Sequence, residues 1–315
     1  MVKWLQIILV LIISNSYAQN LVPNGGFELY SGCPTAPGIG QFDSTLYWIN
    51  PAPYPPGGSP EYFNQCAPGF LNVPNTYWGY QPAFSGDAFC GLTLWYGDVP
   101  EFREYIEAPL LNTLTPNTCY YFEMFINSAN SMNFVSDDIQ VYFSDTAVTD
   151  ITHWFVLPFV PQLSNQSLNF PDSANWTLVS GTYTATGSEN FLIIGNFKDD
   201  LNTTKLFVSF NDPAGDAAFV NIDNVLLTPC TGINDSGLVP VVRVFPNPVS
   251  KIFHVTLNTG EVADLLLYDM ASRLVLKRRI SGYDAIDIEN FQDGIYVYEI
   301  VNSSGFNQRG KLIKN

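Results

Sequence analysis

Turn-forming residues divide the chain into short segments. The side-chain pattern of these segments is that of strands rather than helices. The 315 residues include 23 Gly and 22 Pro, and Phe, Trp and Tyr make up 15% of the total. Residues 139–143 and 219–225 alternate between apolar and polar side chains, as strands with one buried face do. The strand-like segments are Ala88–Tyr96, Cys119–Asn127, Asp138–Phe143, Trp176–Thr184, Phe191–Phe197 and Ala217–Leu227. This pattern predicts an all-β protein built from β-sandwiches.

Charge is distributed unevenly and suggests two separate units. Residues 19–239 carry 21 acidic and three basic side chains, a net charge of −18, whereas residues 240–315 have a net charge of +1. We expect one domain over residues 19–230, a linker over 231–240 and a second domain over 241–315. The acidic unit should repel nucleic acid, so an uncharged glycan, a divalent cation or a basic protein surface is the expected partner. The same acidity would also keep an exported protein soluble.

The first 18 residues have the pattern of a secretory signal peptide. Lys3 precedes the apolar run Trp4–Ile13, and Ser16-Tyr17-Ala18 forms a small-x-small cleavage site. No later segment approaches ~20 uninterrupted apolar residues, so we predict no membrane span in the mature protein.

Five cysteines lie in the acidic unit, and in an exported chain they indicate disulfides with one thiol left over. Spacing does not determine the connectivity. We expect Cys33–Cys66 to close the first long loop and Cys119–Cys230 to join two strand ends, with Cys90 as a buried free thiol. The spacings fit no zinc site.

The C-terminal segment carries an ordered set of short motifs. It opens on Phe245-Pro246-Asn247-Pro248, continues with Gly294-Ile295-Tyr296, and closes on a basic strand that contains Lys311 and Lys314. In this order the motifs resemble the type A C-terminal sorting domain of the type IX secretion system of Bacteroidetes-type bacteria. The resemblance implies a seven-stranded immunoglobulin-like β-sandwich that the outer-membrane export machinery recognises and usually removes. The protein would pass through the periplasm and be secreted or attached to the cell surface.

The edges of the acidic unit carry a second resemblance. The segment Asn24-Gly25-Gly26-Phe27-Glu28 and the segment Ile222-Asp223-Asn224-Val225 are similar to the first and last strands of galactose-binding-like jelly rolls, a superfamily with many carbohydrate-binding modules. In such jelly rolls these two strands are neighbours. The resemblance therefore implies that Glu28 and Asp223 could share a structural Ca²⁺, with a further ligand from the turn at residues 85–87. The alternative is that both are solvated acids at strand ends.

Two sets of side chains are candidates for glycan chemistry. The aromatic candidates for stacking on sugar rings are Trp78, Tyr80, Trp95 and Tyr96, although most aromatic residues in a sandwich belong to the core. The acidic candidates for a glycosidase pair are Asp98, Glu101, Glu104 and Glu107 around Arg103, although a structural pairing of Glu104 with Arg103 would also explain them.

Recognisable catalytic sets are missing from the sequence. There is no Gly-x-Ser-x-Gly, no His-Glu-x-x-His and no P-loop, and the acidic unit holds one histidine, His153. We therefore expect an exported, non-catalytic binding or adhesion module for carbohydrate. The alternatives are a glycan hydrolase that depends on Glu101 or Glu104, and a structural component of a surface layer.

Overall fold

The computed structural model describes residues 19–314 except 36–39, 53–58, 150–155, 167, 209–215, 231–241, 246, 258–261, 272 and 303–306. The predicted signal peptide and the predicted linker over 231–240 therefore lie outside the described residues. The regular secondary structure of the described part is β-strand, apart from one 3-10 turn at Phe42–Ser44. None of it forms a helix long and apolar enough to cross a membrane.

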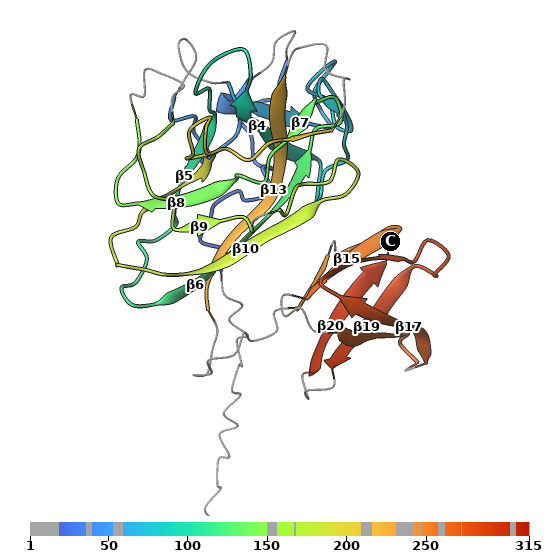
Figure 1. Cartoon of the computed structure of the whole chain (residues 1–315). Coiled ribbons are helices and arrows are strands. Elements are labelled where there is room, and N and C mark those ends of the chain that lie inside the picture. The colour runs from blue at the N-terminus through green and yellow to red at the C-terminus, as the bar shows by residue number, and fades with distance from the viewer. Residues whose placement is uncertain are drawn as a thin grey trace, which may run out of the picture.

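Two antiparallel sheets form the N-terminal part of the chain (Figure 1). The five-stranded sheet has the order β1 (Glu61–Asn64), β4 (Ala88–Tyr96), β13 (Ala217–Pro229), β6 (Cys119–Ser128), β10 (Thr177–Thr184). The four-stranded sheet has the order β5 (Tyr105–Pro109), β11 (Phe191–Gly195), β8 (Gln140–Ser144), β9 (Leu163–Ser164). Two short pairs join β2 (Asn75–Thr76) to β3 (Gly79–Tyr80), and β7 (Phe134–Val135) to β12 (Leu206–Phe207). All six segments predicted as strands contain one of these strands, which confirms the all-β class.

The alternation of side chains along β6 places a cluster on each face of the five-stranded sheet. Phe122 and Met124 belong to the main core, which also takes Ile106 and Ile194 from the four-stranded sheet. Phe125 points the other way and belongs to a second cluster on the outer face of the five-stranded sheet. We call this second cluster the outer-face cluster; it comprises Phe63, Ala67, Leu71, Val73, Phe84, Phe89, Phe125, Ala129, Met132, Trp176, Ala217 and Phe219.

The N-terminal segment lies beside the last strand of this domain, as the resemblance to jelly rolls implied. The Leu21 N–H donates to the Leu227 carbonyl at 2.8 Å, and the Asn20 side-chain amide donates to the Val225 carbonyl at 2.9 Å. The segment itself is a series of turns rather than the predicted strand. Asn24 and Phe27 have φ of 51° and 60°, in the left-handed region that a strand excludes.

Both predicted disulfides are present. Cys33 is bonded to Cys66 and Cys119 to Cys230, and Cys90 is a buried free thiol. The first bond ties the loop after Tyr30 to the end of β1. The second ties the start of β6 to the end of β13, where the Cys230 N–H also donates to the Cys119 carbonyl.

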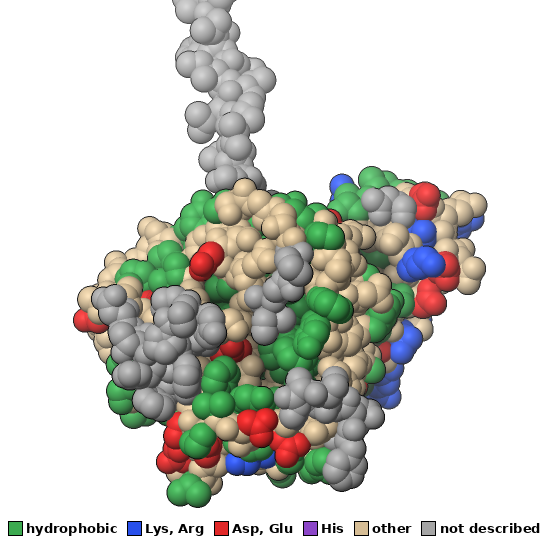
Figure 2. All heavy atoms as spheres, turned by 90° about the horizontal axis from the view of Figure 1, so that it is seen from above, with side chains coloured by type: hydrophobic (Ala, Val, Ile, Leu, Met, Phe, Trp, Pro, Cys, Tyr) green, Lys and Arg blue, Asp and Glu red, His purple; other side chains and the backbone are tan. Residues whose placement is uncertain are grey.

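The C-terminal part is a smaller sandwich of seven strands. One sheet has the order β14 (Val242–Phe245), β15 (Ile252–Leu257), β18 (Tyr283–Asp287). The other has the order β17 (Leu274–Ser281), β16 (Val262–Tyr268), β19 (Gly294–Asn302), β20 (Asn307–Lys314). Its core is separate from that of the N-terminal sandwich and includes Phe253, Leu265 and Ile300. Lys and Arg side chains gather on this smaller part in the space-filling view, in agreement with the charge difference between the two halves (Figure 2).

Candidate ligand-binding site

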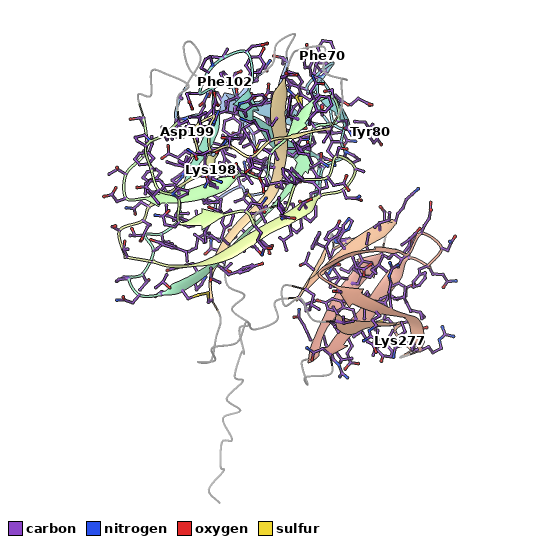
Figure 3. The ribbon with its side chains drawn as sticks, viewed as in Figure 1. Phe70, Tyr80, Phe102, Lys198, Asp199 and Lys277 are labelled. Atoms are coloured by element: carbon purple, nitrogen blue, oxygen red, sulfur yellow. A yellow bond between two sulfur atoms is a disulfide. The ribbon has the colours of Figure 1, made fainter. Side chains whose placement is uncertain are left out.

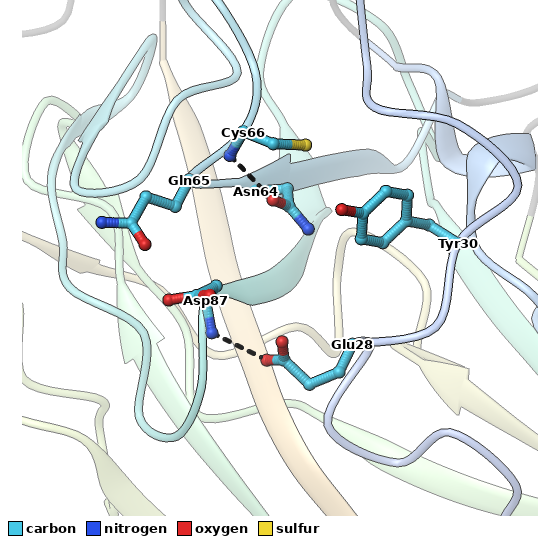
Figure 4. A pocket seen from close by; sticks show the side chains of 6 residues that line it. All are labelled: Glu28, Tyr30, Asn64, Gln65, Cys66 and Asp87. Carbon is cyan, nitrogen blue, oxygen red and sulfur yellow. Dashed lines mark hydrogen bonds between the residues drawn. The ribbon is translucent and has the colours of Figure 1, made fainter.

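A pocket of about 370 Å³ opens where the N-terminal turns meet the end of β1 (Figure 4). The Cys33–Cys66 disulfide holds the two chain segments of its wall together, and the turn before β4 closes the third side. The lining residues are Glu28, Tyr30, Asn64, Gln65, Cys66 and Asp87.

Backbone donors fix the Glu28 carboxylate at the edge of this pocket. Its Oε1 accepts the N–H groups of Asp87 at 2.9 Å and Ala88 at 3.1 Å. Burial raises the pKa of Glu28, although these two hydrogen bonds favour the charged form. The second carboxylate oxygen points toward the pocket (Figure 4).

Asn64 and Tyr30 form the opposite wall. Asn64 Oδ1 accepts the Cys66 N–H, and Asn64 Nδ2 donates to the Tyr62 hydroxyl at 2.8 Å; this hydroxyl donates in turn to the Phe27 carbonyl. The Tyr30 ring is 39% exposed and lies 6.2 Å from the Tyr62 ring. The pocket thus combines one accessible ring face with amide and carboxylate groups that are held in place.

The structure brings Glu28, Asp223 and the turn at residues 85–87 together. Asp223 is fully buried, and its carboxylate accepts the N–H of Ser85 at 3.0 Å and that of Asn224 at 2.6 Å. Burial, and then repulsion by Glu28, raise the pKa of Asp223 well above its usual value. A Cβ on Gly26 would lie 3.8 Å from both the Glu28 Cγ and the Asp223 Oδ1, so the side chains of Glu28 and Asp223 flank this glycine.

The oxygen donors of Glu28 and Asp223 are of the kind that Ca²⁺ prefers. Among the residues that the structure describes, no three or more His, Cys, Asp or Glu side chains form a group that could hold a metal. Backbone carbonyls or water would have to supply the remaining ligands, and the calcium site stays a prediction.

The two predicted aromatic residues of the β2–β3 hairpin have different environments. Trp78 is half-buried, 5.4 Å from Phe219 of the outer-face cluster and edge-on to Tyr77 at 4.5 Å. Tyr80 is 60% exposed. Tyr80 is therefore available to a ligand, whereas Trp78 packs against the outer-face cluster and supports the loop.

The other two predicted aromatic residues lie at the end of β4. Trp95 packs edge-on against Phe134 at 5.2 Å, with the Lys205 ammonium 4.8 Å from the ring centroid. Tyr96 packs against Phe102 at 5.8 Å. The four predicted aromatic residues thus belong to two different elements, and three of them have ring partners.

Two further exposed rings in the loop between β1 and β4 were not among the four predicted stacking residues. Phe70 is 57% exposed and Tyr77 43% exposed, and their rings meet edge-on at 5.2 Å. Phe70 and Tyr80 lie on the same side of the domain in the stick view (Figure 3). Their place in a Pro- and Gly-rich loop was the one feature of the sequence that could have predicted their exposure. This feature is not sufficient, because Leu71 of the same loop is fully buried.

The predicted pairing of Glu104 with Arg103 is wrong. Arg103 is fully buried and forms its ion pair with Asp200 at 3.0 Å, while two of its nitrogens donate to the Lys198 carbonyl. Glu104 instead accepts the N–H groups of Ser59 at 2.6 Å and Thr93 at 2.7 Å. Arg103 therefore anchors the chain after β11 rather than an acidic cluster.

The remaining predicted carboxylates are also bound to backbone amides or exposed. Glu101 accepts the Asp200 N–H at 3.0 Å, and Glu107 accepts the Val148 N–H at 2.9 Å. Burial raises the pKa of Glu107 to about 7. Asp98 is exposed. Backbone N–H groups thus donate to three of these carboxylates, those of Glu101, Glu104 and Glu107. These contacts indicate that the three side chains position the backbone.

The motif residues of the C-terminal domain meet in space. Asn247 donates to the Lys311 carbonyl at 2.6 Å and accepts the Ile313 N–H at 2.8 Å, so the opening loop is bonded to the last strand. Gly294 is paired with Lys314, whose ammonium lies 3.0 Å from Asp293. Tyr296 is 7% exposed and donates to the Gln292 carbonyl. Phe245 ends β14, Pro248 is exposed, and Pro246 lies outside the described residues.

Comparison with known families agrees with this geometry. Residues 243–315 match the family described as the secretion system C-terminal sorting domain, whose family name is Por_Secre_tail. This part of the chain is a type IX secretion sorting domain. The protein is therefore exported, to the cell surface or into the medium, and the type IX machinery is its partner during export.

The other similarities are partial. A stretch of 75 residues is 33% identical to an endo-acting ulvan lyase of Formosa agariphila, but it covers 23% of this chain and 14% of the lyase. Among solved structures, a β-1,2-glucanase from Parabacteroides distasonis is 12% identical, with a TM-score of 0.30 over 95% of this chain and 39% of the glucanase. The tandem CBM22 domains of Paenibacillus barcinonensis Xyn10C are 8% identical, with a TM-score of 0.36 over 95% of this chain and 90% of theirs. We assign no ligand or activity from similarities of this extent.

Proposed function

We propose that residues 19–230 form a non-catalytic binding module for an uncharged glycan, displayed or released by the type IX pathway. The observation that supports this most is the pocket beside Tyr30. Its volume of about 370 Å³ lies in the range of small-ligand sites, and its wall offers a ring face, amides and carboxylates together. A pyranose needs this combination, because its C–H face stacks on an aromatic ring while its hydroxyls require hydrogen-bonding partners.

Four of the six lining residues would contact the sugar. Tyr30 would stack on the sugar ring, and the exposed side chains of Gln65 and Asp87 would bond its hydroxyls. The Glu28 oxygen that faces the pocket would accept a further hydroxyl (Figure 4). Two carboxylates at one small site disfavour an anionic glycan, in agreement with the net charge of −18 over residues 19–239.

The loop that follows Gln65 would extend the site to a longer chain of sugars. Asn72 donates to the Gln65 carbonyl at 3.0 Å and so ties this loop to the pocket wall. The exposed rings of Phe70, Tyr77 and Tyr80 lie on the same loop. Tyr80 is the predicted aromatic residue that we retain as a contact.

Glycan arrays and polysaccharide pull-downs with the full chain test the proposal, followed by calorimetry with any ligand found. We expect Tyr30→Ala to weaken binding roughly tenfold, which corresponds to ~1.4 kcal/mol, the size of one lost stacking contact. Tyr47→Ala is the matched control, because Tyr47 is 53% exposed and does not line the pocket. The absence of any bound glycan, or equal loss in both variants, would refute the proposal.

We also propose that a structural Ca²⁺ binds between Glu28 and Asp223 and joins the N-terminal segment to β13. The support is the pair of neighbouring carboxylates with raised pKa values, because a cation would offset both the burial and the repulsion. Calorimetry of chelator-treated protein with CaCl₂ should detect binding, and chelation should lower the melting temperature. Asp223→Asn should lose both effects. No heat of binding and no shift in melting temperature would exclude the site.

A further inference from the structure

Aromatic rings of the sorting domain lie against the N-terminal domain. Phe245, the first residue of the Phe245-to-Pro248 motif, lies 4.5 Å from Phe84 and 5.5 Å from Phe125 between ring centroids. His254 lies 5.9 Å from Phe84, and Tyr283 lies 6.4 Å from Phe125. These four ring pairs join segments on opposite sides of residues 231–241.

On the N-terminal side, the rings belong to the outer-face cluster. Phe84 and Phe125 are stacked with centroids 3.7 Å apart, and Trp176 lies 6.1 Å from Phe84. With the sorting domain in place, Phe84 is 5% exposed, Phe125 0% and Trp176 8%. Phe125 points away from the core between the two sheets, and both Phe125 and Phe84 contact rings of the sorting domain, so part of the cover over this cluster comes from outside the sandwich.

On the side of the sorting domain, the rings lie on the face of the β14–β15–β18 sheet that points away from its own core. Phe253 and Val255 are part of that core, whereas His254, between them, points the other way. Phe245 is paired with His254 across β14 and β15. Tyr283 stacks on His254 at 5.2 Å, and the Tyr283 hydroxyl and His254 Nδ1 are hydrogen-bonded at 2.6 Å.

We propose that this aromatic contact is an intramolecular docking surface that holds the sorting domain on the outer face of the five-stranded sheet while the two are covalently joined. Four ring pairs among the described residues carry the contact, and we expect it to be too weak to hold separate molecules together, since stable complexes bury about 1,200 Å² or more. A short covalent connection supplies an effective concentration in the millimolar range, which is enough to maintain a weak contact. Cutting the chain within residues 231–240 therefore releases the sorting domain and exposes the rings of Phe84 and Trp176.

This docking would give the exported protein a surface that changes on removal of the sorting domain. Before removal, Phe245 of the sorting motif covers an apolar aromatic patch together with His254 and Tyr283. After removal, the patch is free on a face of the domain that the Tyr30 pocket does not include.

The test uses the full chain with a protease recognition sequence placed within residues 231–240. Hydroxyl-radical labelling with mass spectrometry reports the accessibility of Phe84 and Trp176 before and after cleavage. We expect labelling of both residues to rise severalfold after cleavage, and the two fragments to separate on size exclusion. Low labelling after the fragments separate, high labelling in the uncut chain, or fragments that stay together would each overturn the proposal.

Substitutions distinguish loss of the contact between the two domains from general unfolding of the protein. Phe245→Ala and His254→Glu should raise labelling of Phe84 and Trp176 in the uncut chain. Met270→Ala is the matched control, because Met270 of the sorting domain is 69% exposed and takes no part in the contact. Circular dichroism should show unchanged β-structure in all three. Equal labelling in the control and in both contact variants would contradict the docking surface.

Discussion

Replacing Glu107 by Gln should make the protein more stable at pH 8 and leave it nearly unchanged at pH 5. Glu107 lies on β5, is fully buried, and accepts the Val148 N–H with its Oε1 at 2.9 Å and its Oε2 at 3.2 Å. Burial raises the pKa of Glu107 from 4.5 to about 7. Gln keeps an acceptor for the Val148 N–H but carries no charge, so it removes the cost of a buried carboxylate.

The direction of this stability change follows from proton binding in the folded and unfolded states. Between pH 4.5 and about 7 the folded state holds a proton on Glu107 that the unfolded state has lost, so the free energy of unfolding falls as the pH rises through this window. At ~1.4 kcal/mol per pKa unit the full loss is about 3 kcal/mol. Screening by nearby solvent reduces it to roughly 1–2 kcal/mol.

Urea unfolding of the full chain at pH 5 and pH 8 measures this effect. The informative quantity is the difference between Glu107→Gln and the wild type, because Glu61, Glu104 and Asp223 also have raised pKa values and contribute equally to both proteins. Asp98→Asn, at an exposed acid, is the control and should show no such difference. If the difference between Glu107→Gln and the wild type were the same at both pH values, the reasoning would be refuted.

Three further predictions follow from the described contacts. Arg103→Met should lower the free energy of unfolding by about 3–5 kcal/mol in thermal or urea unfolding, because it leaves the Asp200 carboxylate without its ion pair; a loss below 1 kcal/mol would contradict the anchoring role. Replacing Cys119 and Cys230 by Ser should cost about 2–5 kcal/mol under oxidising conditions, and the difference from the wild type should vanish when the wild type is reduced. Deleting residues 241–315 should leave the protein in the periplasm, and its normal appearance at the cell surface would be evidence against the sorting role.

The strands and the presence of disulfides were predictable because their signals are local or chemical, whereas spacing did not determine which cysteines pair. Alternation along β8 and β13 identifies these strands, and export implies oxidised cysteines. The partner of Arg103 was not predictable, since Asp200 is 97 residues away in sequence and reaches Arg103 only through the folded sandwich. Nor could the sequence tell that Phe70 is exposed while Phe84 is buried, because both belong to one aromatic loop and the rings that cover Phe84, those of Phe125 and Phe245, are distant in sequence.

The bonds between Asn247 and the last strand have a consequence for synthesis. They join residues that are 64 and 66 positions apart, and the backbone of Val249 donates to the Ile313 carbonyl beside them. Chains emerge from the ribosome with the N-terminal part first. The opening motif of the sorting domain therefore lacks these hydrogen bonds until β20 has been synthesised. A chain that stops before β20 cannot assemble the folded motif. The folded export signal therefore needs β20 as well as the opening motif, and neither segment alone can present it.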